Sequence, residues 1–138
     1  MGREIATNKI GGDLYSAMDL VFENQALESS GTTTSDEFML AQTIGGSQLN
    51  LVAGAGGCAT GAGETLTIKV MTSPTSGGTF ANEAFSKVIP ASKTFAAGDR
   101  VASFSPPRDL EEIYTKLLIT SDYDATGQEI TAYPVSLG

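Results

Sequence analysis

The chain has 138 residues, a length typical of one domain, and 16 acidic against 8 basic residues give it a net charge of -8. The basic residues are scattered singly, so we expect no binding to nucleic-acid phosphates. No stretch approaches the ~20 apolar residues of a membrane span, and the first residues lack a secretory signal. We therefore expect no membrane partner. Cys58 is the only cysteine, which excludes an internal disulfide and favours folding in a reducing cytoplasm.

The N-terminal residues predict an arm rather than a core element. Between Met1 and Asp13 the apolar side chains after the initiator are few, and they cannot form a core face. We predict an N-terminal arm over residues 1–17, ordered by contact with a partner, and a β-sandwich domain over residues 18–138.

The next segments predict short strands separated by polar turns. We expect a strand over Met18–Leu27, although the apolar residues around it also fit the spacing of a helix. A polar turn is expected over Glu28–Asp36. Glu37–Thr43 then alternates like a short strand. Ile44–Gly63 is rich in glycine around the apolar patch Leu49–Ala53, which predicts one short strand between irregular loops.

Two strands are predicted at the centre of the core. In Gly63–Ser73 every second side chain, including Leu66, Ile68 and Val70, points to the same side. Glu111–Thr120 repeats this pattern with branched and aromatic residues. We expect these two segments to form the middle of a sheet.

The remaining segments complete an all-β chain. Strands are expected within residues 79–90 and 91–105, the latter ended by Pro106-Pro107. After a tight connection over Ser121–Gly127, residues 129–137 form a closing strand in which Pro134 predicts an edge strand or a bulge. The fold class is all-β, a jelly roll or β-sandwich of about seven to eight short antiparallel strands.

Two motifs imitate ligand sites. Gly54–Ala59 has the spacing of a dinucleotide fingerprint, but a strand follows it instead of the helix that would receive a pyrophosphate, so we interpret it as a loop. Asp122, Asp124, Thr126 and Gly127 resemble the first half of a calcium loop, but Tyr133 stands where a bidentate glutamate belongs. We interpret this second motif as a turn and expect no metal.

Residues suited to catalysis are few. The chain has no histidine, which removes the commonest general base and every histidine-activated nucleophile. Cys58 lies among small residues without an evident activator. Glu111 and Glu112 are adjacent on a strand, so they point to opposite faces. We expect no catalytic residues, no cofactor and no enzymatic activity.

The order of segments resembles a known family. An Asn-Gln-Ala-Leu strand at Asn24–Leu27 is followed by a Ser/Thr turn, a glycine-rich loop and LTIKVMTS at Leu66–Ser73. AGDRV at Ala97–Val101, a strand from Ile113 and a closing Glu129–Ala132 strand complete the order. Over about residues 18–138 this is similar to the capsid cement (decoration) proteins of tailed bacteriophages of the Bordetella-phage type.

The resemblance implies a structural virion protein. Such a protein would be made in the host bacterial cytoplasm and would sit on the outer surface of an icosahedral capsid. It would bind the major capsid protein, associate with itself as a dimer or trimer, and stabilise contacts between capsid subunits. The extra N-terminal arm is a candidate capsid contact, through Arg3, Ile5, Lys9 and Ile10.

Two other functions stay open at this point. A jelly-roll binding module for a glycan or a host surface would need a pocket lined by tyrosines; the candidates are Tyr15, Tyr114, Tyr123 and Tyr133, which are also typical core or rim residues. The second is a joining protein at the neck or tail of a virion, because composition does not distinguish such a protein from a shell protein.

Overall fold

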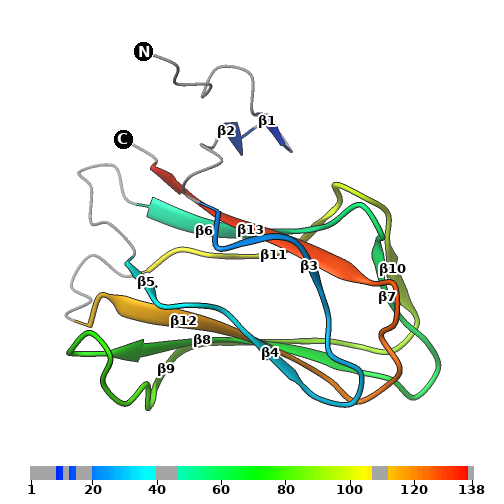
Figure 1. Cartoon of the computed structure of the whole chain (residues 1–138). Helices are drawn as coiled ribbons and strands as arrows, with labels where there is room; N and C mark the ends of the chain where they lie inside the picture. Colours follow the sequence, from blue (N-terminus) through cyan, green and yellow to red (C-terminus); the bar gives the residue numbers. More distant parts are fainter. Residues whose placement is uncertain (1–8, 11–12, 15–19, 40–46, 107–111, 137–138) are drawn as a thin grey trace.

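The computed structural model describes residues 9–10, 13–14, 20–39, 47–106 and 112–136, and in these ranges the regular structure is entirely β. Two antiparallel sheets face each other as the layers of a sandwich (Figure 1). The β6–β13 sheet has the order β11-β6-β13-β3 and contains β3 (Phe22–Ala26), β6 (Ser47–Ala53), β11 (Arg100–Phe104) and β13 (Glu129–Ser136).

The second layer, the β8–β12 sheet, has the order β4-β12-β8-β9, and β5 also pairs with β12. Its strands are β4 (Thr32–Thr34), β5 (Phe38–Met39), β8 (Leu66–Ser73), β9 (Asn82–Ile89) and β12 (Tyr114–Ser121). A short pair of β7 (Cys58–Thr60) and β10 (Lys93–Phe95) lies at one end of the sandwich, and β1 (Lys9–Ile10) pairs with β2 (Asp13–Leu14) near the N-terminus (Figure 1).

The predicted central strands are confirmed. β8 and β12 pair over their whole length, from Tyr114 opposite Ser73 to Ser121 opposite Leu66. Buried and half-buried residues alternate along both strands, because successive side chains point to opposite faces of a sheet. The pair therefore has one face in the core and one face outside it.

The core fills the space between the two sheets. Leu49 and Leu51 of β6 face Ile68 of β8 and Leu117 of β12 within one cluster of buried side chains. Where β9 and β11 lie on the same side of the sandwich, the rings of Phe85 and Phe104 pack with centroids 5.2 Å apart. Apolar burial of this kind stabilises the fold by about 25 cal/mol per Å².

Many of the connections between strands cross from one sheet to the other. Along the chain β3, β4, β6 and β8 belong to alternate sheets, and after the β8–β9 hairpin so do β9, β11, β12 and β13. Neighbours within a sheet are thus seldom neighbours in sequence, as in Greek-key topologies. The described part of the chain has no helix that could span a membrane.

Several predictions at the level of elements are wrong. The polar segment Glu28–Asp36 contains β4, which pairs with β12 over Thr32–Thr34. Its threonines have high strand propensity and can bond across strands, as Thr32 does with the hydroxyl of Thr120 at 2.8 Å. The irregular loop expected after Ala53 contains β7, and β10 is its partner.

The closing strand lies inside a sheet instead of at its edge. β13 pairs with β6 on one side and with β3 on the other. The carbonyl of Ala132 faces β3, because it accepts from Val21 N–H. The nitrogen of Pro134, two residues later, faces the same side but lies beyond the last paired residue of β3. It needs no hydrogen-bond partner there, so the proline is tolerated. The predicted bulge exists nearby, between Ile130 and Ala132.

The other boundaries are shorter than expected. The strand predicted over Met18–Leu27 is β3, Phe22–Ala26, and residues 15–19 lie outside the described ranges. The strand predicted over Glu37–Thr43 is described only as β5, Phe38–Met39.

Candidate interaction surfaces

Two of the four N-terminal contact candidates fall outside the described structure. Arg3 and Ile5 lie outside it altogether. For Lys9 and Ile10 the backbone is described: they form β1, with Lys9 opposite Leu14 and Ile10 opposite Asp13 in β2. The predicted arm therefore contains a small antiparallel strand pair, which the sequence did not suggest.

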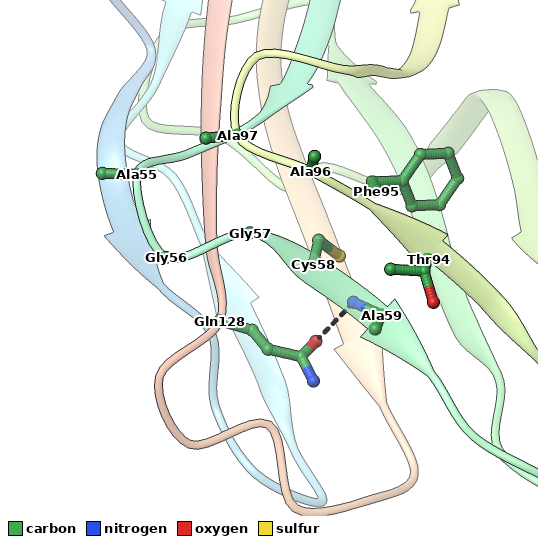
Figure 2. A pocket seen from close by; sticks show the side chains of 10 residues that line it. All are labelled: Ala55, Gly56, Gly57, Cys58, Ala59, Thr94, Phe95, Ala96, Ala97 and Gln128. Carbon is green, nitrogen blue, oxygen red and sulfur yellow. Dashed lines mark hydrogen bonds between the residues drawn. The ribbon is translucent and has the colours of Figure 1, made fainter.

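The glycine-rich segment borders an open groove of about 460 Å³ at the end of the sandwich (Figure 2). The turn after β6 and strand β7 form one wall, and β10 with the turn after it forms the other. The lining residues are Ala55, Gly56, Gly57, Cys58, Ala59, Thr94, Phe95, Ala96, Ala97 and Gln128.

The glycines of this turn allow a close approach of the backbone to β13 and the loop before it. A Cβ at Gly54 would lie 2.8 Å from Asn24 Oδ1, and a Cβ at Gly56 would collide with the carbonyl oxygen of Gly127. The turn amides are used within the fold: Ala55 N–H donates to Asn24 Oδ1 at 2.8 Å, and Gly56 N–H donates to Glu129 Oε1 at 2.9 Å. These two amides are therefore not directed at a phosphate, and a strand follows them instead of a helix.

Cys58 borders the groove but is almost fully buried. Burial raises the pKa of its thiol to about 11, so the thiol is protonated at neutral pH. Because the thiolate is the reactive form, Cys58 is a poor nucleophile in this fold.

The segment that resembles a calcium loop is a tight turn held by its own carboxylates. Asp124 accepts from the hydroxyls of Thr126 at 2.6 Å and Ser29 at 3.0 Å, while Asp122 accepts from the amide and the hydroxyl of Thr65 at 2.8 Å each. The Thr65 bonds lower the pKa of Asp122, and the Thr126 and Ser29 bonds lower that of Asp124. Within the residues that the structure describes, no group of three or more His, Cys, Asp or Glu side chains could hold a metal ion.

The tyrosines considered for a glycan pocket lie apart. Tyr133 belongs to β13 and Tyr114 to β12, so they lie in different sheets. Tyr123 is buried, and its hydroxyl donates to Gln128 Oε1 at 3.2 Å. Burial raises the pKa of Tyr123, with the nearby Cys58, Glu64 and Asp122 adding to the effect. Tyr15 lies outside the described residues.

The outer face of the β8–β12 sheet combines apolar and polar side chains. Leu118 and Met71 are half-buried there, while Met39 and Val88 are 58% and 54% exposed. Lys69 pairs with Glu83 at 3.2 Å, so this salt bridge adds no net charge to the face. The sequence pattern contained a signal for this surface, because the predicted central strands carry apolar residues on both faces.

A cation and an aromatic ring meet on the same face. Lys116 Nζ lies 4.9 Å from the centroid of the Phe80 ring, a cation–π contact. Glu37 is near enough for the charge of Lys116 to help lower its pKa, although the main causes are the hydrogen bonds from Ser76 and Gly77. An outer face with apolar side chains and locally matched charges is suited to contact with another protein.

Two edge strands of the sandwich, β9 and β11, carry features that hinder pairing with a second chain. Lys87 of β9 stands opposite the buried Ile68, so it shares the inward face, and its Nζ donates to the carbonyl of Val101 at 3.3 Å. Val101 lies at a bulge in β11, and β9 has its own bulge opposite Val70 and Met71. Inward-pointing lysines and bulges are typical protections of exposed sheet edges.

The fold defines a class, an antiparallel β-sandwich. Comparison with known proteins finds no protein family and no curated protein that matches the chain.

Proposed function

We propose that this chain is a structural virion protein, a capsid cement protein of a tailed bacteriophage. It binds the outer surface of an icosahedral shell and stabilises contacts between major capsid proteins. The observation that carries the proposal is the agreement between the resemblance and the fold: LTIKVMTS forms β8, and AGDRV forms the turn into β11. A jelly-roll-like order of strands is what the resemblance implies.

The surface chemistry supports a partner that is a protein. The outer face of the β8–β12 sheet offers apolar side chains such as Leu118 and Met39 beside matched charges, which suits a contact made through buried area. The net charge of -8 disfavours nucleic acid as a partner. In this role the protein acts through geometry, without catalysis or a cofactor, as a homo-oligomer.

Cosedimentation with shells of the phage's major capsid protein tests the proposal. We expect saturable binding at a fixed ratio to capsid subunits and greater resistance of the decorated shells to heat. The absence of binding would contradict the proposal and direct the next experiment to a glycan array and to neck and tail components.

The proposed contact face can be tested in the same assay. Leu118→Asp places a charge in the centre of the outer face of the β8–β12 sheet and should weaken shell binding. Ser105→Asp is the matched control, because Ser105 is exposed just after β11 in the other sheet. Equal binding by both variants would exclude this face.

The arm has a separate test. Deletion of Met1–Asp13 should lower shell affinity without unfolding the domain, because the core lies between the two sheets. Unchanged binding by the truncated chain would show that Arg3, Ile5, Lys9 and Ile10 are not contacts.

A further inference from the structure

The outer face of the β6–β13 sheet is covered, although nothing in the sandwich itself requires this. Leu49, Leu51 and Ala53 of β6 point into the core, so Asn50 and Val52 point away from it. Even so, Asn50 is 0% and Val52 2% exposed. The centre of the face that should meet solvent is as buried as the core, whereas Gln48 and Val135 near its end are half-buried.

The partners of these residues on β13 behave in the same way. Tyr133 stands opposite Asn50 and Thr131 stands opposite Val52, so all four side chains share the outer face. Tyr133 is 0% and Thr131 6% exposed. Asn50 and Tyr133 each also have an interaction partner of their own.

These exposed fractions are those of a single chain without a partner. The outer face must therefore be covered by another part of the same chain. The strands β3 and β11 flank β6 and β13 within the plane of the sheet, and the β8–β12 sheet lies on the opposite side, across the core. β3 covers Thr131 in part, because Asn24 N–H donates to Thr131 Oγ1 at 3.0 Å, but strands within the plane of the sheet do not cover Asn50 and Tyr133 at its centre. In Figure 1, β1 and β2 stand on the side of the β6–β13 sheet that faces away from the second layer.

We propose that the N-terminal segment that carries β1 and β2 docks on this face of its own chain. Two observations besides its position favour it. A pair of two-residue strands is not stable alone in water, so its formation is explained by packing on a surface. The segment also enters the domain beside the face, since Val21 N–H donates to the carbonyl of Ala132, next to Tyr133.

The inference gives the N-terminal segment a binding site within the chain. It holds whether or not the protein binds a capsid, and so it is independent of the proposed function. A segment that is docked in this way must leave the face before its own docking residues can contact another protein. Its departure exposes a tyrosine, a valine and an asparagine on one sheet face.

A photo-crosslinking experiment on the full chain tests the docking. A p-azidophenylalanine in place of Tyr133 keeps the aromatic ring, and the same probe in place of Tyr114 is the matched control on the outer face of the other sheet. Equal amounts of isotopically heavy and light chain are mixed before irradiation. Mass spectrometry of the digest then identifies both the crosslinked segment and the chain it belongs to.

We expect the probe at position 133 to crosslink to residues 1–19 of the same chain, and the probe at position 114 not to do so. Crosslinks from position 133 to another segment would overturn the inference. Heavy–light crosslinks would also overturn it, because the cover would then come from a second copy. Capture of solvent alone would show that the face is open.

Thiol accessibility gives a second measurement that avoids the aromatic probe. Val52→Cys and Val88→Cys place the same side chain on the two outer faces of the full chain, and the native Cys58 is buried. With a maleimide, the cysteine at position 52 should react more than about tenfold more slowly than the one at position 88, because it reacts only when the segment leaves. Equal rates would refute the docking.

Discussion

The two sheets of this sandwich differ most on their outer faces. On the β8–β12 sheet most outer side chains are half-buried or exposed, as Val88 is at 54%, and Ser73 at the end of β8 is the buried exception. On the β6–β13 sheet the corresponding residues Val52 and Tyr133 are 2% and 0% exposed. Both faces belong to antiparallel sheets, which commonly leave one face in water. Only one of them does so here.

The difference indicates which side of the molecule is available for a partner. A side chain that is already buried in the isolated chain offers no further area on association, whereas a half-exposed face can still lose its contact with water. The outer face of the β8–β12 sheet is therefore the better site for a stable contact with another protein. The other face behaves as a second layer of core.

Truncation of the two outer tyrosines should give the largest difference between the faces. Tyr133→Ala removes a fully buried ring and should lower the free energy of unfolding by ~3–5 kcal/mol. Tyr114→Ala removes a half-buried ring on the other face and should cost less than ~1.5 kcal/mol. Urea denaturation followed by circular dichroism measures both. Similar losses for the two variants would contradict the contrast between the faces.

A substitution at the glycine-rich turn should have the next largest effect. The turn connects β6 to β7 and packs against the start of β13, and a Cβ at position 56 meets the backbone oxygen of Gly127. Gly56→Ala should therefore lower the free energy of unfolding by ~1–3 kcal/mol.

The matched control for this variant is Gly31→Ala, whose Cβ finds only ordinary contacts, the nearest at 3.5 Å. It should change the stability by less than ~0.5 kcal/mol. A neutral Gly56→Ala variant would show that the turn can relax away from Gly127 without loss.

The strands that could be predicted from the sequence are those with alternating apolar and polar residues, because one face of the strand lies in the core and the other lies outside it. β8 alternates because one face is in the core and the other is not. β4 was missed because its three threonines also suit a turn, and only the pairing with β12 decides between the two. β7 and β10 have three residues each, too few to show a period.

The covered face could not be predicted because its cause lies in a distant segment. Asn50 is polar, which in a strand predicts exposure, and Pro134 next to Tyr133 predicts an edge strand or a bulge. Both residues are accommodated through tertiary contacts that leave no local signal. The groove beside Cys58 could not be predicted for the same reason. It forms between β7 and β10, which are more than thirty residues apart in the sequence.

Removal of the charge on Lys87 should change association more than stability. Lys87→Val makes the inward face of β9 apolar at the sheet edge and releases the carbonyl of Val101, so we expect a new tendency to self-associate through β9. Sedimentation velocity over a concentration series measures this. Lys93→Val is the control, because Lys93 is exposed in β10 outside the two main sheets. Equal association by both variants would indicate a general effect of lost charge.

Acid should loosen the loop contacts at both ends of the β8–β12 sheet. Thr65, just before β8, holds Asp122, just after β12, through its amide and its hydroxyl, and these bonds lower the pKa of Asp122 below its ordinary 3.8. Hydrogen bonds from Ser76 and Gly77 likewise lower the pKa of Glu37 below 4.5.

A carboxyl group whose pKa is lower in the folded chain stabilises the fold above its unfolded pKa, and this stabilisation is lost as the pH falls through the folded value. The melting temperature should therefore be nearly constant around neutrality, where the chain has no histidine to titrate, and should decrease as the pH falls below about 4.5. Because these carboxyl groups are exposed, the effect is a small one. Thermal denaturation over a pH series should show a shallower acid slope for Asp122→Asn than for the natural chain. Identical slopes would mean that the Thr65 bonds do not contribute to stability.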